Sequence, residues 1–246
     1  MAQRRLGFWQ RFSVALVKPP MLGLTRREWR GVEHLPAGGV IIVANHLSHF
    51  DPFVLAHFVY GAGRWPQFLA KASLFEIPVI GNLMHAVRQI PVHRGSTNAV
   101  RALDAAVAAI RAGGVVIIYP EGTTTRDPDL WPMRGKTGAA RLAMATGAPV
   151  VPVVTWGPQQ VFDPRTKRLR LRPLTPVTVV AGPPVDCSRW LPAAGHPGGG
   201  AAETAAAVQD LTDVLMGRLR DMLAEIRQAR PATDAAQRDV EREASA

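Results

Sequence analysis

Short β-branched apolar runs alternate with helix-forming segments through the middle of the chain, and this alternation constrains the fold more than any other feature. Residues 40–43 (VIIV) and 115–119 (VVIIY) are uninterrupted apolar runs of strand length. Further strands are predicted over 67–69, 89–93 and 150–154, and helices from residue 51, over 97–112 and over 137–146. Uninterrupted runs of this kind are typical of parallel strands that are buried on both faces. The sequence therefore predicts an α/β fold, a mostly parallel central sheet with helices on both faces and ligands beyond the carboxyl ends of the strands.

The length of 246 residues fits one α/β domain with appendages. We expect a basic amphipathic segment at 1–34, the main domain at 35–229 and a disordered tail at 230–246, which is polar and lacks periodicity. Apolar residues recur at helical spacing over 203–227, which predicts a long C-terminal helix packed on the core. Cys187 is the single cysteine, and no cleavable signal is recognisable, so we expect a reducing, cytoplasmic setting.

Positive charge is concentrated at the N-terminus. The chain carries a net charge of +10, and its first thirty residues hold seven Lys or Arg against one acid, Glu28. Over 5–17 the apolar residues recur at helical spacing, and Pro19 and Pro20 are expected to end that helix. No apolar run approaches the ~20 residues that cross a bilayer. We expect this segment to lie on anionic lipids at the cytoplasmic face of the cell membrane, as a peripheral or monotopic attachment; the alternative is a helix docked on the protein's own core.

A second basic pattern lies near residue 170. Three arginines alternate with Leu169 and Leu171, which predicts a strand with an exposed basic face: Arg168, Arg170 and Arg172. The strand could be a solvated edge that charge protects from aggregation, or it could bind the phosphates of CoA or lipids.

Two polar segments directly follow predicted strands, residues 45–51 (NHLSHFD) and 119–123 (YPEGT). His46 and Asp51 are five residues apart and share no helix face, so they can meet only if the chain turns sharply between strand and helix. Asp51 is predicted to cap the helix, with Pro52 at its first position. Its carboxylate could also accept the imidazole N–H and hold the other nitrogen of His46 ready to act as a base.

Together these segments resemble the glycerolipid acyltransferase family over roughly residues 35–185, in the order in which that family carries its motifs. The resemblance implies that His46 is the base, that Asp51 orients it and that Arg94 binds substrate phosphate. It also implies an acceptor-binding block, formed by Glu121, Gly122 and Thr123.

The sequence differs from the family pattern after that block. The family usually has Arg directly after E-G-T, whereas Thr124 and Thr125 precede Arg126 here. Either Arg126 or Lys136 would then supply the remaining positive charge at the phosphate.

The resemblance implies transfer of a fatty acyl group from acyl-CoA or acyl-carrier protein to lysophosphatidic acid, 1-acyl-glycerol 3-phosphate, to give phosphatidic acid. It implies no cofactor beyond the acyl donor and no metal. The acceptor could instead be glycerol 3-phosphate, another lysophospholipid or a glycolipid.

Other classes explain fewer of these features. A non-enzymatic nucleic-acid-binding protein would account for the charge but not for the two polar segments, and no nucleic-acid-binding motif is visible, so we expect no nucleic-acid partner. The triplet Gly135-Lys136-Thr137 would need a glycine at position 130 to complete a phosphate-binding loop, and Leu130 stands there, so an NTPase is not expected. No G-x-S-x-G motif is present, which disfavours a serine hydrolase of the α/β-hydrolase class. His46 and His49 lack further residues at metal-ligand spacing.

Overall fold

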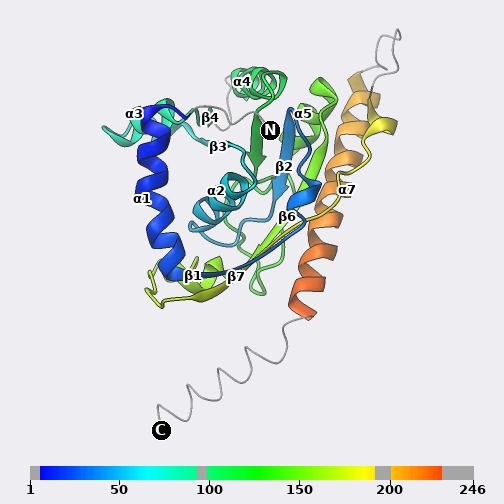
Figure 1. Ribbon diagram of the computed structural model, residues 1–246. Helices are drawn as coiled ribbons and strands as arrows, with labels where there is room; N and C mark the ends of the chain where they lie inside the picture. Colours follow the sequence, from blue (N-terminus) through cyan, green and yellow to red (C-terminus); the bar gives the residue numbers. More distant parts are fainter. Residues whose placement is uncertain (1–5, 93–98, 192–200, 229–246) are drawn as a thin grey trace.

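The computed structural model describes residues 6–92, 99–191 and 201–228 (Figure 1). Its strands form one seven-stranded sheet in the order β1-β7-β6-β2-β5-β3-β4. The strands are β1 (Thr25–Arg30), β2 (Val40–Ala44), β3 (Pro66–Lys71), β4 (Ile90–Val92), β5 (Val115–Ile118), β6 (Val150–Trp156) and β7 (Thr175–Ala181). Neighbouring strands are parallel except for the antiparallel pair β6 and β7. The predicted, mostly parallel sheet is confirmed.

Helices cover both faces of this sheet, as predicted (Figure 1). The α-helices are α1 (Phe8–Leu24), α2 (Asp51–Gly61), α3 (Ile80–Ala86), α4 (Ala99–Arg111), α5 (Gly138–Thr146), α6 (Pro158–Val161) and α7 (Ala201–Gln228). Short 3-10 helices are η1 (Val32–His34), η2 (Ala72–Leu74) and η3 (Ser188–Trp190). Helices α1 and α2 lie over one face, and α4, α5 and α7 lie over the other.

Strand β2 at the centre shows why the apolar runs are uninterrupted. Ile41 and Val43 pack into the core under α4, α5 and α7, whereas Val40 and Ile42 pack into the core under α1 and α2. All four side chains are fully buried. Side chains alternate between the faces of a strand, so a strand covered on both sides must be apolar at every position.

Helix α1 continues through Pro19 and Pro20, so the prediction that these prolines end it was wrong. Each proline removes one backbone N–H, but its φ angle is compatible with a helix. The last turn is held instead by Met21, which is buried against the core and whose carbonyl accepts bonds from the backbone and side chain of Thr25. Within the described ranges, no helix is both long enough and apolar enough to cross a bilayer.

The predicted basic strand near residue 170 was also wrong. Residues 165–174 form an irregular segment that makes one isolated bridge, between Phe162 and Leu169. Regular pairing begins only with β7, and Pro173 has no N–H to donate to a neighbouring strand. Leu169 and Leu171 are therefore exposed rather than buried beneath a layer of arginines.

The long C-terminal helix is confirmed as α7, and its apolar side packs on the core. The predicted tail at 230–246 lies outside the described residues, as do 1–5, 93–98 and 192–200. Strand β1, which falls inside the predicted N-terminal segment, pairs with β7 at the edge of the sheet.

We expect Leu219→Ala in α7 to lower the free energy of unfolding by about 2–5 kcal/mol, because the side chain is fully buried and its removal leaves a cavity. Leu171→Ala is the matched control, since that leucine is 67% exposed and its loss should change stability by less than about 0.5 kcal/mol. Urea titrations of both variants and the native protein measure the two differences. Similar losses in both variants would contradict the packing assigned to α7.

Candidate active site

The two polar segments leave neighbouring strands at the same edge of the sheet. Strand β2 runs parallel to β5, so residues 45–51 and 119–123 both follow carboxyl ends. The side chains that the sequence singled out in these two segments are therefore brought close together.

His46 and Asp51 meet across a tight turn between β2 and α2. The Nδ1 atom of His46 lies 2.9 Å from Oδ2 of Asp51. The same oxygen accepts backbone N–H groups from Leu47 at 2.6 Å and Ser48 at 2.8 Å. Because the carboxylate only accepts, Nδ1 carries the proton and Nε2 is left as the basic nitrogen.

Asp51 does not cap helix α2, so that part of the prediction was wrong. Asp51 is the first residue of α2, and its carboxylate points back to the preceding turn. The N–H groups of Phe53 and Val54 bond to the carbonyl of Phe50 instead. The donors of the turn occupy Oδ2, and Oδ1 faces the hydroxyl of Thr155 at 3.5 Å, so neither oxygen bonds a backbone N–H of the helix.

Glu121 fastens the second polar segment to the first. One carboxylate oxygen accepts the backbone N–H of His46 at 3.1 Å, and the other accepts that of Met133 at 3.0 Å. The side chain is almost fully buried, and this desolvation raises the pKa of Glu121, against the opposing effect of its two backbone hydrogen bonds. Glu121 thus joins the backbone at His46 to the backbone at Met133.

The rest of the E-G-T block is arranged around Lys136. Gly122 has a φ of +70°, and a β-carbon there would lie 3.0 Å from Nζ of Lys136, so the lysine side chain passes directly over the glycine. Thr123 lines the cavity described below. Arg126 is exposed and is not among the residues that line this cavity, and Arg94 lies outside the described residues.

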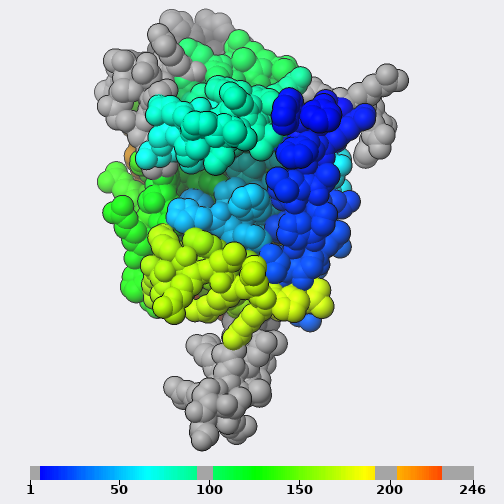
Figure 2. Space-filling model, turned by 90° about the vertical axis from the view of Figure 1, so that its left-hand side faces the viewer, coloured from blue at the N-terminus to red at the C-terminus, as the bar shows by residue number. Residues whose placement is uncertain are grey.

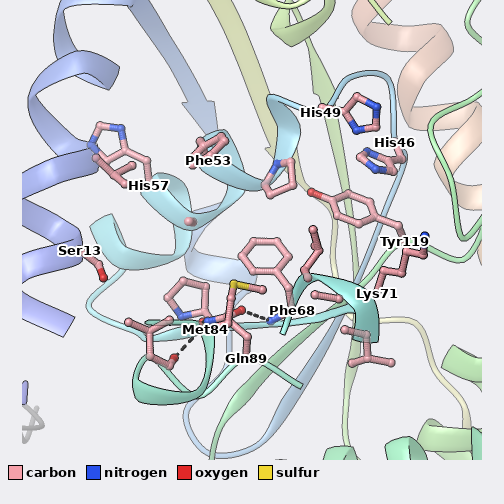
Figure 3. Close-up of a pocket in the computed structure, with 18 of the residues that line it drawn as sticks. Ser13, His46, His49, Phe53, His57, Phe68, Lys71, Met84, Gln89 and Tyr119 are labelled. Carbon is pink, nitrogen blue, oxygen red and sulfur yellow. Dashed lines mark hydrogen bonds between the residues drawn. The ribbon is translucent and has the colours of Figure 1, made fainter. Parts of the chain in front are cut away.

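A largely apolar cavity of about 640 Å³ opens beside this site. Its lining comes from α1, α2, β3, the segment around η2 and α3, and the E-G-T segment. Figure 3 shows His46, Tyr119 and Lys71 at one end, and Ser13 and His57 at the end next to α1. The size is within the usual range for pockets that hold small molecules.

Tyr119 lies directly against the imidazole. Its ring stacks on that of His46 with centroids 4.1 Å apart and planes 17° apart, and it also stacks on Phe68. The hydroxyl is buried and has no hydrogen-bond partner among the residues that the structure describes. Burial, with the negative charge of Asp51 as a lesser cause, raises the pKa of Tyr119 well above 10, so the phenol stays a proton donor.

Tyr119 and Lys71 are two residues that the sequence reasoning missed. The sequence pattern placed Tyr119 at the end of a predicted strand, and it assigned no role to Lys71. The available signal was position, since each lies at the carboxyl end of a strand in this sheet, where α/β proteins bind ligands.

His49 lies near His46, with ring centroids 6.3 Å apart. Partial burial lowers the pKa of His49, and the charge of Lys167 lowers it further. Within the described ranges, no group of three or more His, Cys, Asp or Glu side chains is placed to hold a metal ion.

Comparison with known proteins adds to this geometry. Residues 26–156, more than half of the chain, match the Acyltransferase family. The chain is 33% identical over 136 residues to a chloroplastic 1-acyl-sn-glycerol-3-phosphate acyltransferase of Brassica napus, covering 54% of this chain and 38% of that protein. It is 31% identical to a 1-acyl-sn-glycerol-3-phosphate acyltransferase of Borreliella burgdorferi, covering 54% and 52%. The chain thus spans only 38% and 52% of the lengths of these two relatives.

A solved structure has a similar fold. The 1-acyl-sn-glycerophosphate acyltransferase PlsC from Thermotoga maritima superposes with a TM-score of 0.55 at 24% sequence identity. The superposition covers 85% of this chain and 80% of that one.

Asp51→Ala should release the tautomer of His46. In the native protein the carboxylate requires a proton on Nδ1, whereas the variant has no acceptor at that position, so the proton should be shared between Nδ1 and Nε2. Nitrogen-15 NMR of the imidazoles distinguishes the two forms. His34 is the internal control, because its Nδ1 lies 2.8 Å from the carbonyl of Ala181 and should stay protonated in both proteins. An unchanged His46 spectrum would contradict the proposed control of the tautomer by Asp51.

Proposed function

The chain belongs to the Acyltransferase family, and we propose that it moves a fatty acyl group from acyl-CoA or acyl-carrier protein to the free hydroxyl of 1-acyl-glycerol 3-phosphate, giving phosphatidic acid. The observation that carries this proposal is the His46–Asp51 pair at the end of an apolar cavity. The names of the relatives support the acceptor. A nucleic-acid-binding role would leave both the pair and the cavity without a purpose.

The chemistry follows from the tautomer. Nε2 of His46 takes the proton of the acceptor hydroxyl while that oxygen attacks the thioester carbonyl. Asp51 stabilises the imidazolium that forms, and the face of the Tyr119 ring contributes a cation–π interaction. The tetrahedral intermediate then releases the thiolate, which takes the proton from the imidazolium. Since none of the residues that the structure describes accepts a hydrogen bond from the Tyr119 hydroxyl, we assign it as a donor to the carbonyl oxygen.

The cavity is suited to an acyl chain. Its lining is dominated by apolar side chains that include Val17, Phe53, Phe68 and Leu69. Burial of apolar surface contributes about 25 cal/mol per Å², so each methylene placed there adds binding energy without directional contacts.

Cations beside the imidazole are suited to the acceptor phosphate. Lys71 ends β3 and lines the cavity next to Tyr119 (Figure 3), and Lys136 crosses the E-G-T block. Arg94 follows β4, which pairs with β3, so the sequence resemblance and the topology both favour it as a third phosphate ligand. Arg126 is disfavoured, because it is exposed and away from the cavity lining.

Helix α1 is suited to a membrane surface. Ser13, Val14, Val17 and Lys18 line the cavity, whereas Phe8, Trp9, Phe12 and Leu16 are exposed. At about 3.6 residues per turn these two sets occupy opposite sides of the helix. We therefore propose that the segment 1–34 attaches to anionic lipids at the cytoplasmic face of the cell membrane through α1, and that residues 35–229 form the acyltransferase domain, to whose sheet β1 is added at the edge.

His46→Ala should lower kcat for acyl transfer by at least about 100-fold while leaving the fold intact, because the general base is lost. The assay presents acyl-CoA and acyl-carrier protein with 1-acyl-glycerol 3-phosphate, glycerol 3-phosphate and other lysolipids, and measures the acylated product. His85→Ala is the control, since His85 is exposed and is not among the residues lining the cavity. Turnover by His46→Ala comparable to that of the native protein would contradict the assignment of His46 as the general base. Transfer to none of these acceptors from either donor would overturn the proposed function.

Lys71→Ala should raise KM for the phosphorylated acceptor about tenfold and change KM for the acyl donor much less, because a charged contact to phosphate is lost. Lys71→Arg keeps the charge and should retain most of the affinity. Arg94→Ala is expected to act in the same direction as Lys71→Ala. An equal increase in KM for donor and acceptor would separate Lys71 from the phosphate site.

A further inference from the structure

The segment at 165–174, which we name the Arg–Leu loop, is unusual in charge and exposure. Its ten residues (RTKRLRLRPL) are all exposed and hold five Lys or Arg and no acid. Its three leucines are exposed over more than half of their surface: Leu169 (55%), Leu171 (67%) and Leu174 (60%). Exposed leucines that alternate with arginines are typical neither of a buried core nor of a surface that contacts only water.

Both ends of the Arg–Leu loop are fixed to elements that the proposed function uses. Just before its start, Ser48 donates a hydrogen bond of 2.6 Å to the carbonyl of Phe162, whose ring contacts His49. Lys167 Nζ lies 3.3 Å from Nε2 of His49. At its end, the backbone N–H of Leu174 donates to the carbonyl of Gly23 in α1 at 3.0 Å. The loop thus connects the turn that carries His46 with the C-terminal end of α1.

The space-filling view places this loop on the same face of the molecule as α1 (Figure 2). The face is hollowed at its centre, where α2 is visible, and α1, the segment around α3 and the segment that includes the Arg–Leu loop form the rim. Exposed large apolar side chains occur on each part of this rim, including Phe12 on α1 and Ile77 before α3. An apolar surface of this kind surrounding a ligand cavity marks an interaction site.

We propose that the Arg–Leu loop is a second membrane-binding element, which inserts its leucines among the lipids of an anionic bilayer while its cations contact the phosphates. This inference rests on the proposed function, since it supplies the face through which a lipid acceptor would reach the site. Phosphates alone would be matched by the arginines, but only a bilayer offers an apolar layer directly beneath its phosphates for the leucines. An acidic protein or nucleic acid would leave the leucines in water.

Two membrane-binding elements fix the orientation of the domain on the bilayer, which a single helix does not. A single amphipathic helix on a bilayer leaves the attached domain free to rotate about it. With α1 and the Arg–Leu loop both in contact, the hollow between them is held against the lipid surface. The acceptor would then pass from the bilayer to His46 without crossing water.

The test measures binding of the full chain to sedimenting vesicles of phosphatidylcholine with phosphatidylglycerol. Replacing Leu169, Leu171 and Leu174 with serine should weaken partitioning about tenfold or more, because less apolar surface enters the lipid. Val32→Ser is the control: Val32 is exposed in η1, before β2, at the opposite edge of the sheet from His46. Arg168→Gln should weaken binding to these vesicles and leave binding to pure phosphatidylcholine unchanged. Native partitioning by the triple variant, or equal losses in the triple variant and Val32→Ser, would overturn the proposal.

A second measurement reports insertion without removing the leucines. A Leu171→Cys variant in a Cys187→Ser background, labelled with an environment-sensitive dye, should become brighter and shift to shorter wavelength on anionic vesicles, whereas a dye on Val32→Cys should not. Unchanged emission at residue 171 would show that the loop stays in water and would overturn the proposal. Binding is read without acyl transfer, and transfer to a short-chain, water-soluble acceptor should be unaffected by the triple variant. A bound but inactive native protein would therefore count against the proposed function alone.

Discussion

One oxygen atom, Oδ2 of Asp51, holds together the part of the molecule on which the site depends. It accepts the backbone N–H groups of Leu47 and Ser48 and faces Nδ1 of His46, all within 2.9 Å. Burying a carboxylate is costly unless its lone pairs are satisfied, and Asp51 is fully buried. The turn supplies those donors, so the interaction that makes the burial tolerable is the same one that orients the imidazole.

A second buried carboxylate has a different task. Both oxygens of Glu121 are occupied by backbone N–H groups from separate segments, at His46 and Met133. Asn45 adds a similar link, since its side-chain amide bonds both backbone groups of Thr155 in β6. The ends of β2, β5 and β6 are thus joined by side chains where strand pairing stops. An imidazole carried on such a support can be held to within the tolerance that acid–base chemistry requires.

The sequence predicted the parts of this structure that depend on periodic burial, and it failed where a single contact decided the outcome. Apolar runs such as 40–43 identified the sheet, because covering a strand on both faces leaves no polar position. The helix end at Pro19 was wrong because burial of Met21 outweighs the loss of backbone donors, and sequence does not reveal which apolar residue will find the core.

The candidate site was predictable to the same extent. The five-residue spacing identified His46 and Asp51, and the turn then placed them as required. The capping role of Asp51 was wrong, since the nearer N–H donors of the turn were not visible in the spacing. Tyr119 was missed because an aromatic residue at the end of a strand resembles a core residue; only the structure shows that its hydroxyl has no hydrogen-bond partner in the described part of the chain.

Helix α1 lies between the cavity and the proposed membrane surface. Val17 lines the cavity from one side of the helix, and Phe12 is exposed on the other. An acyl chain in the cavity and a bilayer outside would both favour the same docked position of α1. Two ligands that favour one conformation must strengthen each other's binding by the same factor. Occupation of the cavity by the acyl chain should therefore tighten membrane attachment, and membrane attachment should tighten retention of the chain until transfer is complete.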